Sequence, residues 1–259
     1  MSGGNPLRSI TAVAALSLLA LASFGTVLTF EIPVTPDEAL AHAEEVSDPG
    51  DVYVWKCPTS DGSSYTLERL ELEIPSHDKS DILRVPTVFV PVPILLVDSE
   101  DPSVKQVADH ILSKTEGYSD YLKITAALYF VQSSIRYTSD QELYGYHEFW
   151  AAPCETLRLH KGDCEDTSVL LMSILGAMGY DSVLLDYDGH EAVGVRQGDQ
   201  PSLDYLYCET AMDDILKPGF GDWYGEPFVY VPGDTSVLNE TANGFLAAYR
   251  QIIQRVAGT

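Results

Sequence analysis

The segment that most constrains the fold is KGDCEDTSVLLMSILGAMGY, which runs from Lys161 to Tyr180. Apolar side chains dominate from Val169 to Met178, so a helix formed here has almost no polar face to turn toward solvent. Such a helix is expected to be central and buried, with the other elements packed around it. Gly179 is a suitable C-terminal cap, because glycine adopts the left-handed backbone conformation readily.

A cysteine lies where this helix should begin, surrounded by acids. Cys164 follows Asp163, a candidate N-terminal cap, and precedes Glu165 and Asp166. A helix N-terminus stabilises a thiolate, the reactive form of cysteine, whereas nearby carboxylates raise the pKa of a thiol. A reactive thiol at this position therefore needs a cationic partner, and an imidazolium is the usual one.

Glu165 and Asp166 have two interpretations. As acids in the first turn they interact favourably with the helix dipole, by about 0.3–1 kcal/mol each. As metal ligands they would need further acids, and no second acidic cluster is expected to face them. The sequence therefore favours the first interpretation, and we expect neither a metal nor a cofactor.

The chain after the helix has the pattern of antiparallel strands. SVLLDY (182–187) predicts a strand, Asp188 and Gly189 a tight turn, and HEAVGVR (190–196) the returning strand. His190 starts that second strand, so it should lie at the end of the sheet rather than in its middle. A buried helix packed on this hairpin could bring Cys164 and His190 together.

A third strand, YLYCETA (205–211), supplies an acid. Alternation along it puts Tyr205, Tyr207 and Glu209 on one face and Cys208 on the other. If it pairs beside the strand of His190, Glu209 can face the imidazole and orient it. The residues thus permit a triad of Cys164, His190 and Glu209, although isolated patterns of this kind also arise by chance.

The first half of the chain has one strand signal and two helix signals. YTLERLELEI (65–74) alternates apolar and charged residues, and helical spacing marks 103–115 and 120–136. VPTVFVPVPILLV (85–97), broken by prolines, predicts extended structure, and an amphipathic helix is expected near 244–256. Helices followed by antiparallel strands indicate the α+β class.

The N-terminus has a long uncharged segment from Ser9 to Phe30, preceded by Arg8 and followed by Glu31. About 20 apolar residues are enough to span a bilayer as a helix. The flanking charges predict that the short N-terminus is cytoplasmic and the rest of the chain lies outside. A signal peptide cleaved near 20–22 is the alternative, with secretion as its result.

Composition divides the rest of the chain and excludes one class of partner. We expect an acidic linker at 31–51 after the anchor at 1–30, a β-rich extension at 52–102, and a catalytic domain at 103–259. The whole chain has 39 acids, 15 bases and a net charge of −24, which argues against binding to nucleic acid.

Cys57, Cys154 and Cys208 can form at most one disulfide if Cys164 stays free.

Three blocks resemble a known superfamily. "PCETLRLHKGDCEDTSVLLMSILGAMGY", "VLLDYDGHEAVGV" and "YLYCETA", followed by "DWYGEPF", resemble the transglutaminase-like superfamily, above all its membrane-associated archaeal and bacterial branch. The resemblance covers roughly 103–228 and is most specific around Cys164. It implies a papain-like core in which Cys164 is the nucleophile, His190 the general base and acid, and Glu209 the third member. Many relatives have aspartate at the third place.

The implied activity is that of a thiol enzyme acting on amide bonds of a protein or peptide, at or outside the cell surface. Hydrolysis is favoured over transfer to an amine, because nothing marks an amine-binding site. A non-catalytic binding module of the same fold is the alternative, and a purely structural surface protein is a third. Tyr146 and Trp150, in the loop before the cysteine, could line an acyl groove, bind an oxyanion or simply pack.

Overall fold

The structure is a computed structural model that describes residues 36–46, 51–74, 93–196, 205–212, 214–221 and 225–232. The segment expected to anchor the chain, Ser9 to Phe30, lies outside the described residues, as do most of 85–97 and the helix expected near 244–256. Among the helices that are described, none combines the length and the apolar character that a membrane crossing requires.

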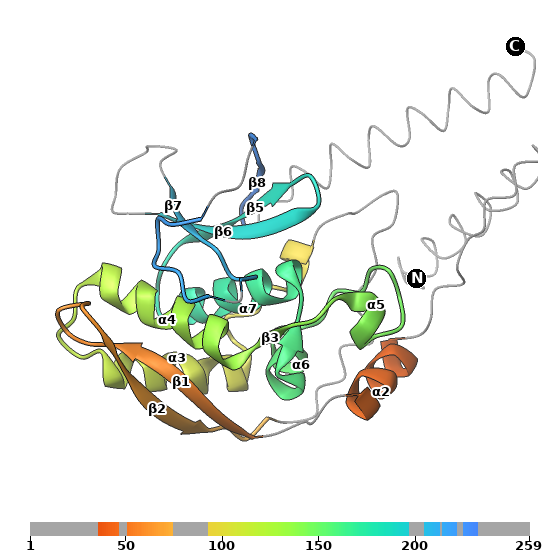
Figure 1. The fold of residues 1–259 in the computed structure, drawn as a ribbon, viewed down its shortest axis with the longest axis horizontal. Helices are drawn as coiled ribbons and strands as arrows, with labels where there is room; N and C mark the ends of the chain where they lie inside the picture. Colours follow the sequence, from red (N-terminus) through yellow and green to blue (C-terminus); the bar gives the residue numbers. More distant parts are fainter. Residues whose placement is uncertain are drawn as a thin grey trace, which may run out of the picture. The chain divides into compact units, whose positions relative to one another are not determined.

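The described chain combines helices with antiparallel sheets and one short parallel pair, β3 with β4, which confirms the α+β class (Figure 1). In order, the elements are α2 (Pro36–Val46), β1 (Val52–Pro58), β2 (Tyr65–Glu71), the 3-10 helix η1 (Pro93–Leu96), α3 (Pro102–Lys114), α4 (Asp120–Ser134), β3 (Arg136–Tyr137), α5 (Asp140–Leu143), α6 (Pro153–Leu159), β4 (Lys161–Gly162), α7 (Cys164–Ala177), β5 (Ser182–Tyr187), β6 (His190–Arg196), β7 (Tyr205–Cys208) and β8 (Phe228–Tyr230).

The four-stranded sheet has the order β7-β6-β5-β8, with every neighbouring pair antiparallel. Strands β5 and β6 form the hairpin that the sequence predicted, with Tyr187 opposite His190 beside the turn. Strand β7 pairs with the other edge of β6, with Cys208 opposite Val193. The chain segments that carry His190 and Glu209 are therefore neighbours in one sheet, as the alternation pattern required.

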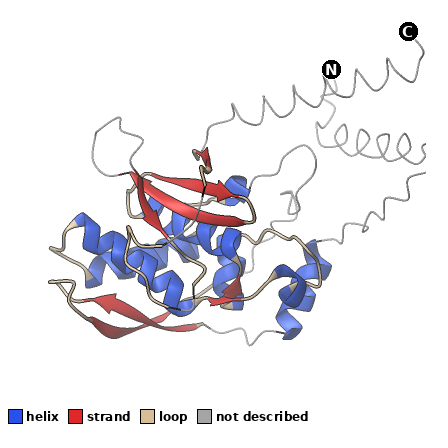
Figure 2. Ribbon diagram, turned by 45° about the horizontal axis from the view of Figure 1, so that its top comes forward, coloured by secondary structure: helices blue, strands red, loops and turns tan. Residues whose placement is uncertain are grey.

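Helix α7 is buried along nearly its whole length, as its apolar sequence predicted. Figure 2 shows the helices lying between this sheet and the β1–β2 hairpin. Leu170, Leu171 and Leu175 are fully buried in the main core. Replacing one such leucine by alanine typically costs about 2–5 kcal/mol, so the helix that carries Cys164 is also the centre of the fold.

The β1–β2 hairpin joins the same core. Tyr53 and Trp55 of β1 are buried, and the Tyr53 hydroxyl donates to the carbonyl oxygen of Leu157 at 2.7 Å. The Trp55 ring meets Phe130 of α4 edge-on, with the ring centroids 5.8 Å apart. The large apolar area of these aromatic rings holds the hairpin against α4 and α6.

The end of α7 follows from its sequence. Gly179 has a φ of 87°, a left-handed conformation that glycine adopts without a steric penalty. The N–H of Tyr180 then donates to the carbonyl oxygen of Leu175 at 2.9 Å, which satisfies a carbonyl at the helix end. Gly179 therefore caps the helix as predicted.

Some elements differ from the sequence pattern. Strand β2 ends at Glu71, and β7 ends at Cys208, so Glu209 lies just beyond its strand. The reason at Glu209 is local, since its carboxylate accepts the backbone N–H of Ala211, a contact that turns the chain out of the ladder. Residues 36–46, inside the expected linker, form α2, whose buried Ala39 and Ala43 lie one turn apart.

Candidate active site

Cys164 is the first residue of α7, with Asp163 at the N-cap position. The backbone N–H of Glu191 favours the thiolate of Cys164, and the Cys164 S–H donates to Oε2 of Glu165 at 3.3 Å. Glu191 directly follows His190 in β6. The thiol therefore lies against the start of the strand that carries the predicted base.

The environment of the thiol favours its protonated form. Burial, and after it the charge of Asp163, raises the pKa of Cys164 to about 12. The Glu191 N–H works in the opposite direction but does not outweigh burial. Stabilisation of the thiolate by the helix start is thus overcome here, and Cys164 needs a base to remove its proton.

His190 and Glu209 form a buried pair. Nε2 of His190 lies 3.0 Å from Oε2 of Glu209, and the two residues are 9% and 3% exposed. Burial by itself raises the pKa of Glu209. Hydrogen bonds from His190, the Ala211 N–H and the Tyr207 hydroxyl more than offset this, so the Glu209 pKa is lowered. Glu209 is therefore a carboxylate able to orient an imidazole and stabilise its cation.

Tyr207 is a site residue that sequence reasoning missed. Its hydroxyl donates to Oε2 of Glu209 at 2.7 Å, the same oxygen that contacts His190. Gly221 lies against the Tyr207 ring, since a Cβ at this glycine would come within 2.4 Å of the ring atom Cε1. The alternation pattern put Tyr207 and Glu209 on the same face of the strand. Two residues on one face need not share a hydrogen bond, so the pattern did not predict this contact.

Gln132 of α4 fixes the backbone around Glu209. Its side-chain N–H donates to the Glu209 carbonyl oxygen at 2.7 Å, and its side-chain oxygen accepts the N–H of Leu216 at 3.2 Å. Because Gln132 is 77 residues away in the sequence, no local pattern could have identified it. It connects the segment after β7 to a core helix.

Hydroxyl groups connect the helix of Cys164 to the two strands. Thr167 and Thr210 share a hydrogen bond of 2.9 Å, and the Ser168 hydroxyl donates to the Glu191 carbonyl oxygen at 3.3 Å. These contacts hold the first turn of α7 against β6 and the segment after β7. All three predicted site residues are thus carried on elements that are bonded directly to one another.

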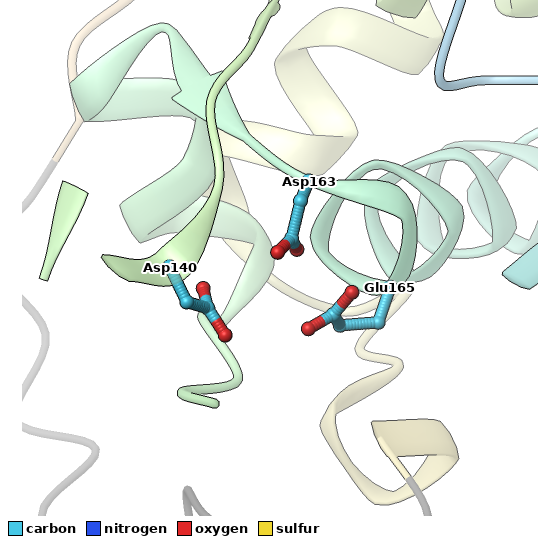
Figure 3. A group of neighbouring side chains, drawn as sticks. All are labelled: Asp140, Asp163 and Glu165. Atoms are coloured by element: carbon cyan, nitrogen blue, oxygen red, sulfur yellow. The ribbon is translucent and has the colours of Figure 1, made fainter. Parts of the chain in front are cut away.

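A second group of acids lies at the start of α7, around the position of the thiol. Asp140 of α5 faces Asp163 and Glu165, and one oxygen from each carboxyl lies within 4.8 Å of the others (Figure 3). We call these three residues the acid cluster. The sequence predicted no second acidic cluster opposite the first turn of α7, and the structure places one further acid, Asp140, beside it. Asp140 was missed because 23 residues separate it from Asp163 in the sequence.

Trp150 has the packing role that was one of its three interpretations. Its ring is buried with Leu96 and Val169, and its Nε1–H donates to Oε1 of Glu148 at 3.0 Å.

The four cysteines are free thiols, so no disulfide connects the described parts of the chain.

The sequence matches no protein-family model and no curated protein. Among solved structures, the chain is distantly similar to Legionella pneumophila LapG. The EGTA-treated form has a TM-score of 0.37 and 14% identity, over 60% of this chain and 90% of that one. The calcium-bound form has a TM-score of 0.36 and 14% identity, over 56% and 88%. At these values, the assignment of function rests on the site itself.

Proposed function

We propose that this chain is a thiol enzyme that cleaves or transfers an amide through a thioester on Cys164. The observation that carries the proposal is the buried His190–Glu209 pair, 3.0 Å apart. His190 begins β6, and the backbone N–H of the next residue, Glu191, favours the thiolate of Cys164. Buried titratable groups are costly to a fold and concentrate where chemistry uses them. The proposed machinery is Cys164 as nucleophile, His190 as base and acid, and Glu209 as the group that orients His190.

The chemistry begins with a proton transfer, because Cys164 rests as a thiol. His190 takes the S–H proton, and the sulfur forms a bond to the amide carbonyl carbon as the C=O π electrons move to oxygen. When the tetrahedral adduct collapses, the C–N bond breaks and His190 returns the proton to the leaving amine. The thioester then reacts with water or with a second amine, which frees the thiol.

The nitrogen of His190 that exchanges this proton would be Nδ1, since Nε2 contacts Glu209. The negative carboxylate holds the ring in one orientation and stabilises the cation that forms during attack. The backbone N–H of Cys164 is one of those that the start of a helix leaves without a partner in that helix. It is suitably located to donate to the developing oxyanion.

The resemblance to the transglutaminase-like superfamily supports a protein or peptide as the substrate. It also supports a papain-like arrangement, in which a helix bearing the cysteine packs on an antiparallel sheet. Hydrolysis is the proposed outcome, with transfer to an amine as the second possibility. We also propose that Ser9 to Phe30 tethers the domain outside the cytoplasm, with secretion after signal cleavage as the alternative.

A non-catalytic binding module is the second candidate, and one observation favours it. The pKa of Cys164 is raised to about 12, and its S–H is directed to Glu165, so the resting thiol is not prepared for attack. A module that has kept the fold and lost its activity would show the same feature. The two candidates differ in whether Cys164 ever forms a covalent adduct.

The test is incubation of the full-length protein with glutamine-containing peptides, with and without a primary amine. Ammonia release without the amine indicates hydrolysis, and incorporation of the amine indicates transfer. An acylating probe, whose thioester on Cys164 is detected by mass spectrometry, tests the thiol even if its substrate is not among the peptides. If the wild-type protein forms neither product nor adduct, and His190→Ala gives the same result, the binding module is the correct description.

A further inference from the structure

We infer that a cavity at the C-terminal end of α7 binds a free α-amino acid that has an apolar side chain. We call it the end cavity. The inference goes beyond the proposed activity and does not depend on it. It rests on the position of the cavity, its apolar wall and two opposite charges at its rim that are not paired with each other.

The end cavity has a volume of about 270 Å³ and lies where α7, β5 and the segment after η1 meet (Figure 1). Its walls come from residues far apart in the sequence, namely Val97, Ser99, Met172, Gly176, Ser182 and Val183. Gly176 is twelve residues along α7 from Cys164, and a helix rises about 1.5 Å per residue, so the two are about 18 Å apart. The cavity is therefore separate from the candidate active site.

The wall between α7 and the segment after η1 is fixed by contacts within the chain. The Ser173 hydroxyl of α7 accepts the backbone N–H of Asp98 at 3.0 Å. Gly176 allows the close approach, because a Cβ at this position would lie 3.0 Å from the Cβ of Ser99. A site whose walls are already ordered loses less conformational entropy when a ligand binds.

The most buried residues of the end cavity are apolar. Met172 and Val183 are only 1% and 2% exposed, and Val97 packs against the main core. Val231 and Pro232, just after β8, continue the apolar surface. A methionine side chain is flexible and polarisable, so it adapts to apolar groups of different shapes. The cavity therefore suits a ligand that has an apolar group.

Two opposite charges lie at the rim of the end cavity. Arg196 and Asp181 both line it and are exposed, and the N–H of Arg196 donates to the carbonyl oxygen of Asp181 at 3.0 Å. Their backbones are thus neighbours, yet neither side chain forms an ion pair with any described residue. Composition alone favours a partner for this arginine, since the chain has 39 acids and 15 bases. The rim therefore offers a cation and an anion that a ligand can use.

These charges select the chemical class of the ligand. A guanidinium binds a carboxylate through two parallel N–H···O bonds, and a carboxylate accepts hydrogen bonds from an ammonium. A free α-amino acid has both groups on one carbon atom, whereas a peptide has them at opposite ends. Arg196 would bind the carboxylate and Asp181 the ammonium, with the apolar side chain against Met172.

The size and the remaining polar groups of the end cavity agree with this class. Pockets for drug-sized ligands have about 300–1,000 Å³, so a cavity of about 270 Å³ suits a smaller molecule. Ser99 and Ser182 also line the cavity, and their hydroxyls form no hydrogen bond with the residues that the structure describes. A hydroxyl both donates and accepts, so each serine can bond to either charged group of the ligand.

The test is calorimetric titration of the full-length protein with L-leucine and with three analogues that each lack one feature. Isocaproate lacks the ammonium, isoamylamine lacks the carboxylate, and glycine lacks the apolar side chain. We expect one leucine per chain. Each analogue should bind more weakly by about tenfold or more, because each loses a charged or an apolar contact worth about that factor.

Three variants locate the site. Arg196→Met and Asp181→Asn should each weaken the binding of leucine by about tenfold or more. Arg196→Met should also bind leucine and isoamylamine with similar affinity, because it no longer has a group that binds the carboxylate. Val231→Trp should fill the cavity and abolish binding. Val231 is 40% exposed, so this change does not enlarge a buried core residue.

Arg136→Met is the matched control. Arg136 is an exposed arginine of β3 that has no ion pair among the described residues, and it does not line the end cavity. This variant should bind leucine as the wild type does. Circular dichroism checks that each variant is folded. The same titration in Cys164→Ala should give the wild-type affinity, which separates binding from activity.

Three results would overturn the inference. One is that leucine releases no heat and leaves Tm unchanged in folded wild-type protein. Another is that isocaproate or isoamylamine binds as tightly as leucine, which would mean that the two charges are not recognised together. The third is that Arg196→Met and Val231→Trp bind leucine as tightly as Arg136→Met, which would put the ligand elsewhere.

The analogue series needs only wild-type protein, so it decides the question even where a variant does not fold. The outcome is also distinct from that of the activity assay. A protein that binds leucine in the end cavity but never forms an adduct on Cys164 would refute the proposed activity and leave this inference intact.

Discussion

Glu209 and the acid cluster illustrate opposite fates of a buried carboxyl in one candidate site. Burial raises the pKa in both places. At Glu209 three donors face one carboxylate, namely the His190 ring, the Tyr207 hydroxyl and the Ala211 N–H, and they lower its pKa. In the cluster the neighbours are mostly other acids, and the pKa values rise.

The comparison shows that burial alone does not decide which carboxyl is charged, because donors offset it at Glu209 and neighbouring acids add to it at Asp140. Asp140 accepts only one N–H, from Phe149, although it is as buried as Glu209. Glu209 is therefore arranged to hold a negative charge beside an imidazole. The carboxyls of the acid cluster face mostly other acids, which favours their protonated forms.

The largest expected loss of activity comes from replacing Cys164 or His190, the two residues that Glu209 supports in the proposed mechanism. Cys164→Ala removes the nucleophile, so the thioester should not form at all, and His190→Ala should lower turnover by more than about 1,000-fold. Adduct mass and product release measure this. Cys57→Ala, in β1, is the control and should keep its activity, because Cys57 takes no part in the site. Equal loss in that control would point to unfolding instead.

Glu209→Gln should lower kcat by about 10- to 1,000-fold, because it keeps the shape of the side chain but removes the charge that favours the imidazolium. Adding this change to Cys164→Ala should cost nothing further, since residues that act as a unit are not additive. Asp186→Asn, on β5 of the same sheet, is the matched control. If Glu209→Gln is fully active, Asp213, which lies outside the described residues, is the next acid to test.

Tyr207→Phe should lower kcat by about tenfold and leave KM unchanged, because it removes one hydrogen bond to a charged group, worth about 1.5–3 kcal/mol. The lost donor allows the pKa of Glu209 to rise toward its usual range. Since the pair with His190 needs the carboxylate, the acidic limb of the rate profile should move to higher pH. Tyr205→Phe should leave that limb in place. A loss of rate without a shift would indicate a merely structural role.

The smallest effect is expected on the stability of the folded protein, through the carboxyl of Asp140. The folded pKa of Asp140, about 10, is far above its unfolded value of about 3.9, so the stability it provides is lost as pH rises through this window. Asp140→Asn does not titrate and should raise Tm by a few degrees at pH 8, with a smaller gain at pH 5. Thermal unfolding at the two pH values measures this. A gain that is larger at pH 5 would contradict the sign.

The sequence predicted the elements whose signals are local. The apolar run fixed α7 as a buried helix, and the Asp188–Gly189 turn fixed the β5–β6 hairpin at its observed bounds. The contact of Glu209 with His190 followed from alternation along one strand. Asp140 and Gln132 could not be identified, because they reach the site through tertiary packing and carry no periodic pattern of their own. The raised pKa of Cys164 depends mainly on burial, which spacing does not give.

The parts of the site are dispersed along the chain, and this has a consequence during synthesis. Glu209 follows Cys164 by 45 residues. The two hydrogen bonds of Gln132 that fix the backbone around Glu209 also need Leu216. At about 5–20 residues per second, the growing chain contains the thiol for about 2–9 seconds before the acid is made. During that interval the cysteine has no oriented base, so on the proposed mechanism a half-made molecule should not react with other proteins near the ribosome.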